Sequence, residues 1–245
     1  MCAGAEMDNR IRILYEDNHL LCVFKPGGLL VQGDRTGDTT ALELAKRYIK
    51  EKYGKPGNVF LGLVHRIDRP ASGVVVFART SKAASRLSRE FHDRKVKKTY
   101  LAVVWGRIAE DQGELVSYIE RAHLRSRIAE RPSASAKQAV LHFTVLARRE
   151  DLTLVEVSPA TGRHHQIRLQ FARAGHPVVG DLKYGATAPL PDKTIALHAT
   201  SLTFEHPVRE EPVTICAPPP TSYPWSLFGV TIADRFAPRE PERRP

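Results

Sequence analysis

The chain has 245 residues, enough for one large domain or two small ones, and its 42% hydrophobic and 26% charged residues exclude a mainly disordered chain. No stretch approaches 18 uncharged apolar residues, and the N-terminal decapeptide MCAGAEMDNR lacks the apolar run of a signal peptide, so we expect a cytoplasmic protein that does not enter a membrane. Lys and Arg outnumber Asp and Glu by 37 to 27, and the net charge of +10 either favours a polyanionic partner or reflects a basic proteome.

The N-terminal part begins with a predicted disordered arm, residues 1–10. Apolar runs within residues 11–25 flank the dipeptide Asp17-Asn18, which predicts a β-hairpin. Thr40 and Glu43 have the spacing of a capping box, in which each side chain binds the other residue's backbone N–H, so we expect a helix to begin there.

The rest of the chain carries many strand signals and few helix signals. Apolar, β-branched runs predict strands at 59–64, 73–78, 101–105, 115–119, 139–147, 152–157, 195–197, 202–204 and 213–216. Apolar residues at helical spacing predict helices over 81–94 and 165–174. Because strands do not alternate regularly with helices, we predict an α+β fold: a largely antiparallel or mixed β-sheet with flanking helices and a central cleft.

We expect one domain over residues 11–230, with no internal repeat and no linker. The basic, polar segment 121–137 is the best candidate for a mobile loop. Residues 231–245 are rich in proline and arginine, and we expect a tail whose last part, from Asp234, is too charged to pack.

Signatures of cofactor chemistry are missing from the sequence. It contains neither G-x-G-x-x-G nor G-x-x-x-x-G-K-[ST], the glycine-rich motifs that bind dinucleotides and nucleoside triphosphates. Three widely spaced cysteines and ten scattered histidines indicate neither a disulfide framework nor a metal site. We therefore predict no cofactor and no metal.

Two polar segments could carry chemistry. The first, HRIDRP (65–70), places Asp68 between Arg66 and Arg69 and between two apolar strands, where the carboxylate needs a nearby cation to stay ionised. That acid is either a usable nucleophile or one half of a structural ion pair. The second, Arg163-x-x-Gln166-x-Arg168, is either a solvated helix face or a clamp for phosphate or carboxylate. Neither segment decides the function by itself.

In order and spacing, four motifs resemble the catalytic domain of the RluA-type RNA pseudouridine synthases. They are HRIDRPASGVVVFART, KKTYLAVVWG, TGRHHQIRLQFARAGHPVVGDLKYG and LHATSLTFEHP, and the resemblance runs from about residue 11 to 217. It implies an enzyme that isomerises uridines of ribosomal or transfer RNA to pseudouridine, by base flipping and without a cofactor. An N-terminal S4-type RNA-binding domain, common in such proteins, is not expected, because only about ten residues precede the first strand.

The resemblance also implies the catalytic residues. Asp68 matches the family's catalytic aspartate, Tyr100 the tyrosine that stacks near the base and serves in proton removal, and Arg168 the basic residue that pairs with the aspartate. Spacing alone leaves Arg163 open as the alternative partner of Asp68.

Four residues are assigned to substrate binding. Arg66 matches the arginine that enters the space left by the flipped base, and Leu197 matches an apolar residue of the uracil pocket. His65, in the same HRID motif, and Arg163 complete the set. Lys95, Lys97, Lys98 and the 121–137 segment are expected to supply a basic surface for RNA.

Three residues depart from the family pattern, and two other functions are compatible with parts of the sequence. Ile67 replaces a usual Leu, whereas Ala71 and His164 change hydrogen-bonding groups beside the site and bear on the choice of substrate. The main alternative is a non-catalytic RNA-binding or ribosome-assembly factor on the same fold. A glycosidase needs a second acid, and the only acid in the other motifs, Asp181, is more simply interpreted as part of a turn. We expect a monomer.

Overall fold

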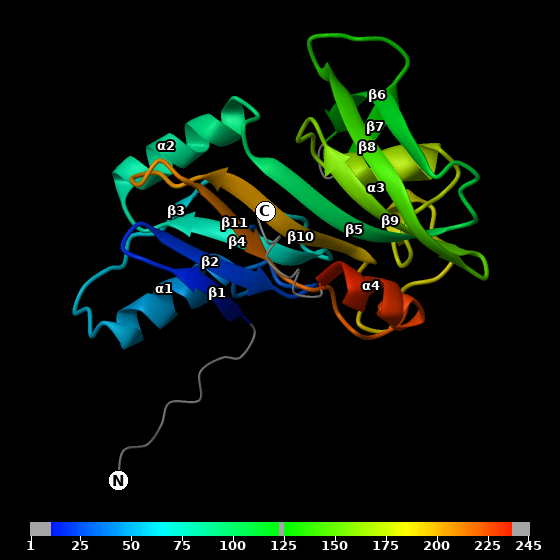
Figure 1. Cartoon of the computed structure of the whole chain (residues 1–245). Helices are drawn as coiled ribbons and strands as arrows, with labels where there is room; N and C mark the ends of the chain where they lie inside the picture. The colour runs from blue at the N-terminus through cyan, green and yellow to red at the C-terminus, as the bar shows by residue number, and fades with distance from the viewer. Residues whose placement is uncertain (1–10, 123–124, 237–245) are drawn as a thin grey trace, which may run out of the picture.

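The computed structural model describes residues 11–122 and 125–236, so the predicted arm 1–10 and the end of the predicted tail lie outside the described residues. Eleven strands of this part form one sheet (Figure 1), in the order β1-β2-β4-β10-β5-β9-β8-β6-β7, with β3 paired to β4 and β11 to β10. The strands are β1 (Arg12–Glu16), β2 (Leu20–Lys25), β3 (Gly62–Leu63), β4 (Ser72–Ala78), β5 (Lys97–Trp105), β6 (Gln112–Ala122), β7 (Arg125–Ala129), β8 (Ala136–Arg149), β9 (Leu152–Pro159), β10 (Leu197–Glu205) and β11 (Pro212–Cys216).

The helices of the described part are α1 (Ala41–Lys52), α2 (Ser81–His92), α3 (Gln166–Arg173) and α4 (Gly229–Phe236), with short 3-10 helices η1 (Leu182–Tyr184) and η2 (Trp225–Phe228). No described helix has the length and hydropathy that a membrane crossing requires. Only β4 and β10 pair in parallel, and the other pairs are antiparallel. The α+β fold and the mixed, largely antiparallel sheet predicted from the sequence are confirmed.

The sheet is covered on both faces around β2 and β4. Successive side chains of a strand point to opposite faces. In β4, Val75 and Phe77 pack with α1, whereas Val74 and Val76 pack with α2. This explains why β4 is a continuous apolar run rather than an alternating one. The predicted capping box is present, since the Thr40 and Glu43 side chains each accept a hydrogen bond from the other residue's backbone.

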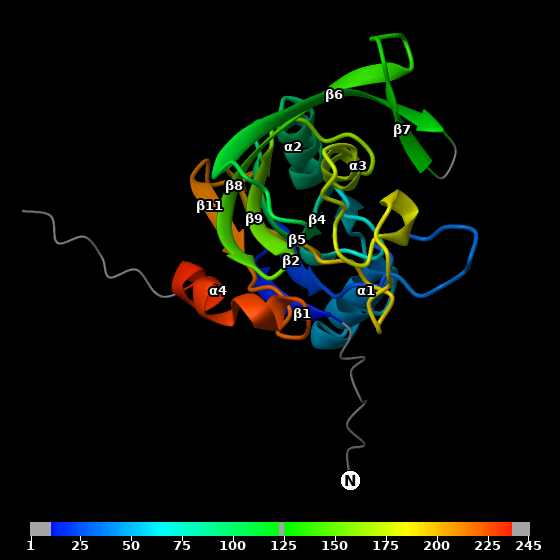
Figure 2. The same ribbon diagram turned by 90° about the vertical axis from the view of Figure 1, so that its right-hand side faces the viewer.

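Seen at right angles to that view, β6, β8 and β9 curve around α3, with α4 on their outer side (Figure 2). The contact between β4 and β10 is very close. A Cβ atom on Gly73, which has φ +132°, would lie 2.3 Å from the carbonyl oxygen of Ala199. Glycine at 73 therefore lets β10 approach the strand that directly follows the HRIDRP segment.

Strands at three places differ from the predictions. The predicted loop 121–137 is wrong over most of its described residues, because β6 continues to Ala122 and β7 pairs with it from Ala122↔Arg125 to Tyr118↔Ala129. Backbone hydrogen bonds hold this two-stranded ribbon together, and they do not require apolar side chains. A prediction based on apolar runs therefore does not detect a strand that carries exposed arginines. Residues 130–135, between β7 and β8, are the part that forms neither strand nor helix. The runs predicted at 195–197 and 202–204 lie largely in one strand, β10, whose middle contains buried polar residues. Only Gly62–Leu63 of the predicted 59–64 strand pairs, opposite Ala78 and Phe77. Residues 59–61 would lie beyond the end of β4, where the chain turns into α2.

The expected domain end at residue 230 falls inside α4, which runs to Phe236. Arg235 in its last turn forms an ion pair with Glu156 on β9, and Trp225 and Phe228 before it are buried in the main core. Asp234 and Arg235 are thus helical, and the ion pair ties Arg235 to the sheet, although both side chains stay exposed.

Candidate active site

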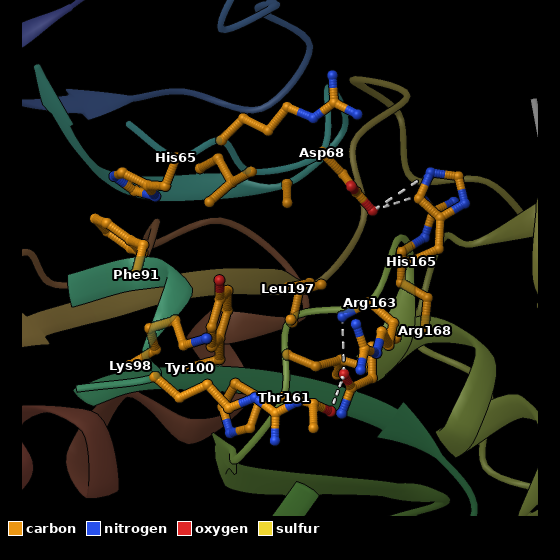
Figure 3. Close-up of a pocket in the computed structure, with 18 of the residues that line it drawn as sticks. His65, Asp68, Phe91, Lys98, Tyr100, Thr161, Arg163, His165, Arg168 and Leu197 are labelled. Carbon is orange, nitrogen blue, oxygen red and sulfur yellow. Dashed lines mark hydrogen bonds and ion pairs between the residues drawn. The ribbon is translucent and has the colours of Figure 1, made fainter. Parts of the chain in front are cut away.

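One cavity of about 570 Å³ collects almost all the chemistry-bearing residues of the two polar segments. Its walls come from the 65–71 loop, the end of α2, β5, the turn after β9 and the start of α3. Five Arg or Lys side chains and one acid line it: Arg66, Arg94, Lys98, Arg163, Arg168 and Asp68. In Figure 3, His65 and Phe91 lie at one end, Asp68, His165 and Arg168 at the other, and Tyr100 between them.

A buried lysine, Lys25, binds the backbone of the 65–71 loop. Lys25 is fully buried at the end of β2, and its Nζ donates hydrogen bonds to the carbonyl oxygens of Leu29 (2.7 Å), Arg69 (3.2 Å), Ala71 (2.7 Å) and Pro26 (2.9 Å). Two of these carbonyls, those of Arg69 and Ala71, follow Asp68 closely in the chain. Lys25 thus cross-links the loop that carries Asp68 to the turn after β2.

Replacing Lys25 with methionine is expected to lower the free energy of unfolding by about 2–4 kcal/mol, because buried carbonyls lose their donor. Burial lowers the pKa of Lys25 to about 7 from its ordinary 10.5. Between these values the unfolded chain binds more protons, so the lysine's contribution to stability rises with pH. The destabilisation by Lys25→Met should therefore grow from pH 7 to pH 10, as chemical denaturation at several pH values would measure. A constant difference would contradict this account.

Asp68 pairs with Arg168 across the cavity. Arg168 Nη1 donates to Asp68 Oδ2 at 2.9 Å, although the two residues are 100 positions apart in the chain. The guanidinium is buried, whereas the Asp68 side chain keeps 24% of its surface exposed toward the cavity. An adjacent cation stabilises the charged form of a carboxylate. No hydrogen bond within the described part of the chain engages Oδ1, the other oxygen of Asp68, so that oxygen faces any ligand unpaired.

Arg168 is itself held by a second acid that sequence reasoning interpreted as a turn. Asp181 accepts from Arg168 Nε at 2.6 Å and from Nη2 at 2.8 Å, and both residues are buried. Asp181 also precedes η1, so the turn interpretation was correct but incomplete. Burial opposes the charged form, but the hydrogen bonds that Arg168 donates to Asp181 and the charge of Asp68 raise the pKa of Arg168 above its ordinary value. Because Asp181 holds two N–H groups of the planar guanidinium, a third N–H, on Nη1, is directed at Asp68.

Arg163 does not compete for Asp68. Its Nε donates to the backbone carbonyl of Gln138 on β8 at 3.0 Å, and its own backbone N–H donates to Gln166 Oε1. The question that spacing left open is answered by the geometry in favour of Arg168. Arg163 nevertheless lines the cavity at the turn after β9.

His65 has two partners within the fold. Its Nε2 accepts from the backbone N–H of Val76, and its ring stacks on Phe91 of α2 with centroids 4.7 Å apart. Burial, together with the nearby Lys98, lowers the pKa of His65 to about 3. The ring is therefore neutral at pH 7 and joins β4 to α2 at the wall of the cavity.

Tyr100, Leu197 and Arg66 complete the site. Leu197 is buried at the start of β10 and Tyr100 lies on the neighbouring β5, so the two form part of the cavity floor. Burial and the charge of Asp68 raise the pKa of Tyr100 above its ordinary value. Its phenol therefore stays protonated at neutral pH, which argues against a phenolate base. Arg66 is exposed at the rim of the cavity.

Sequence reasoning missed one neighbour of Asp68, His165, and the tyrosine that contacts it, Tyr184. His165, which precedes α3, has its Nε2 3.7 Å from Asp68 Oδ2, and its Nδ1 lies 2.7 Å from the hydroxyl of Tyr184 in η1. His165 and Tyr184 both stand inside the quoted TGRHHQIR…GDLKYG motif, so their position in it was the available signal. Within residues 11–122 and 125–236, no three His, Cys, Asp or Glu side chains are grouped as metal ligands would be.

The comparisons with known proteins agree on one family. The sequence profile described as RNA pseudouridylate synthase matches residues 19–173, more than half of the chain. A dual-specificity RNA pseudouridine synthase RluA of Haemophilus influenzae is 39% identical over 209 residues, which cover 84% of this chain and 91% of that protein. The ribosomal large subunit pseudouridine synthase D of Xylella fastidiosa is 38% identical over 227 residues, covering 87% and 67%. Among solved structures, human RNA pseudouridylate synthase domain containing 4 superposes with a TM-score of 0.72 at 25% identity, covering 91% and 92%.

Proposed function

This chain belongs to the RNA pseudouridine synthase family and converts uridine in RNA to pseudouridine, and we propose that Asp68 is the carboxylate that does so. The reaction breaks the bond from C1′ of the ribose to N1 of the uracil and forms one from C1′ to C5. The proton at C5 is lost and N1 gains one, so no group enters or leaves overall. The observation that carries the assignment is the pairing of Asp68 with Arg168 at 2.9 Å inside the cavity.

Asp68 has the geometry of a prepared nucleophile. Its Oδ2 is bound to Arg168, and its Oδ1 is left for the substrate. Arg168 cannot rotate away, because Asp181 holds two of its other N–H groups. The carboxylate can thus attack, or stabilise positive charge at the sugar, without first losing a partner. The same arrangement serves whether the carboxylate attacks the sugar or the ring.

The uridine must leave its stack to reach Asp68. Flipping costs a few kcal/mol, which contacts to phosphates and an inserted side chain can offset. We assign the insertion to Arg66, since it is exposed at the rim of the cavity. Tyr100 and Leu197 would then support the flipped uracil from below, with Tyr100 as a protonated phenol.

We propose RNA of the large ribosomal subunit as the substrate, because the Xylella fastidiosa relative is named a ribosomal large subunit pseudouridine synthase. Transfer RNA is the second candidate. Release of tritium from RNA labelled at C5 of uridine tests the reaction. Mapping pseudouridines in total RNA with and without the protein identifies the position. No tritium release from either RNA would reject the assignment.

Binding is expected to depend steeply on salt. If about six phosphates are contacted, affinity should fall about 10³-fold between 50 and 200 mM salt. Lys97→Ala removes an exposed lysine next in the chain to the cavity-lining Lys98, and it should reduce the slope of log affinity against log salt by about one. Lys50→Ala, on α1, is the matched control and should leave the slope unchanged. A flat response in the wild type would contradict an electrostatic contribution to binding.

We also propose that the protein is a monomer and lies in the cytoplasm. The exposed large apolar side chains of the described residues are scattered over separate segments, which supports a monomer: Tyr53, Phe60, Val116, Leu182, Val208, Tyr223 and Val230. Light scattering should give the mass of one chain. The cytoplasm is the compartment we propose, and fractionation of cells that express the protein tests it.

A further inference from the structure

His165 lies next to the catalytic carboxylate, yet no step of the proposed reaction uses it. Its backbone has φ 55°, a left-handed conformation at the residue before α3, and its side chain does not cap the helix. The ring instead stacks on His164, with centroids 3.7 Å apart, and presents one nitrogen to Asp68 and the other to Tyr184. A strained backbone next to a reacting group is a reason to ask what the side chain does.

The proton of the His165 ring can be placed so that every group around it has a partner. The backbone N–H of Ser126 on β7 donates to the Tyr184 oxygen at 3.0 Å, so the phenol's own proton is available for His165 Nδ1 at 2.7 Å. Nδ1 is then an acceptor, and the proton of a neutral imidazole lies on Nε2. Nε2 faces Asp68 Oδ2, which can only accept. In the series Ser126 N–H, Tyr184 hydroxyl, His165 ring and Asp68 carboxylate, each donor thus faces an acceptor.

Burial and the charged neighbours of His165 keep its ring neutral at pH 7. Burial is the main cause that lowers its pKa to about 3; Asp68 opposes this, while Arg168, His164 and Lys183 reinforce it. Those four residues, with Tyr184, are the titratable or charged groups of the loop, α3 and η1 that face the ring. A neutral ring can donate to the carboxylate without neutralising its charge.

Tyr184 also supports the other donor to Asp68. The guanidinium carbon of Arg168 lies 5.1 Å from the centroid of the Tyr184 ring, a cation–π distance. Tyr184 therefore contacts both neighbours of Asp68: its hydroxyl contacts His165 and its ring contacts Arg168. Its hydroxyl is fixed by β7, the ribbon strand that the sequence prediction missed.

We propose that His165 is a positioning residue for Asp68, and that Tyr184 holds it in the tautomer with the proton on Nε2. The 3.7 Å separation is longer than a hydrogen bond and shortens to one when RNA closes the site, as catalytic contacts commonly do. Arg168 and His165 would then both occupy Oδ2, which keeps Oδ1 aimed at the substrate. The inference rests on the proposed function of Asp68 as the catalytic carboxylate.

The experiment compares Tyr184→Phe, His165→Leu and His165→Gln by kcat, KM and Tm across pH 5.5–8. Tyr184→Phe and His165→Leu should lower kcat about 10-fold or more at pH 7.5, since loss of an orienting partner or the wrong tautomer slows catalysis, and KM should stay within about twofold. His165→Gln, whose amide N–H can replace Nε2–H, should recover most of the loss. Tyr48→Phe is the matched control, because it removes a hydroxyl bound to Glu16 far from the cavity and should leave kcat unchanged.

The double variant separates positioning from mere packing. In Tyr184→Phe the ring can carry its proton on Nδ1 instead, which leaves Nε2 with no proton to donate to Asp68. A glutamine at 165 does not need Tyr184 to present its N–H, so the double variant Tyr184→Phe/His165→Gln should have the kcat of His165→Gln alone. Because burial keeps His165 neutral, the loss of kcat in Tyr184→Phe should be the same from pH 5.5 to pH 8. A wild-type kcat in Tyr184→Phe, or a lowered Tm alone, would overturn the inference, whereas an inactive wild type would overturn the proposed function.

Discussion

Asp68→Asn is expected to abolish pseudouridine formation, with a loss of kcat of at least about 10³-fold. The amide has nearly the shape of the carboxylate but supplies neither its negative charge nor its nucleophilic oxygen. Tritium release from RNA labelled at C5 of uridine measures the loss. The affinity for RNA should change by less than about threefold, because basic side chains rather than Asp68 contact phosphates.

The fold should tolerate Asp68→Asn. Arg168 keeps its two hydrogen bonds to Asp181, and the Asp68 side chain is partly exposed, so no buried charge is left without a partner. Asp151→Asn, in the exposed turn between β8 and β9, is the matched control and should retain full activity. Substantial tritium release by Asp68→Asn with unchanged Tm would remove Asp68 from the catalytic role.

Arg168→Met is expected to impair both activity and stability. Asp181, which is 1% exposed, would lose its cation and both hydrogen bonds, and breaking a buried pair in this way costs about 3–5 kcal/mol. Asp68 would lose its orienting donor, so kcat should fall at least about 10²-fold at temperatures where the variant remains folded. Chemical denaturation and the tritium assay measure the two effects separately.

A double variant distinguishes catalysis from folding. In Arg168→Met/Asp181→Leu both buried charges are replaced by apolar side chains, and such replacements are often neutral or stabilising. Much of the lost free energy of unfolding should return, while activity should not, because Asp68 still lacks its partner. If activity returned together with stability, Arg168 would have only a structural role.

Local interactions account for what was predictable. The capping box at Thr40 and Glu43, the hairpin at Asp17-Asn18 and the apolar β4 depend on residues a few positions apart, and all three are present. The HRID segment was conspicuous, because an acid between arginines and apolar strands requires an explanation. The strand β7 was missed because its five residues, RSRIA, include two arginines and one large apolar residue, and its pairing depends on a partner strand rather than on apolar alternation.

The class of fold, the family and the residue types that carry the chemistry follow from the order of the amino acids, because they depend on composition, periodicity and motifs within short stretches. The three-dimensional arrangement was needed to show which arginine meets Asp68, that Asp181 holds that arginine, and that β7 is linked to the carboxylate through Tyr184 and His165. The physical reason is that these contacts join residues up to 100 positions apart. They exist because β10 lies between β4 and β5 and α3 packs inside the curved strands, an order that no local pattern specifies.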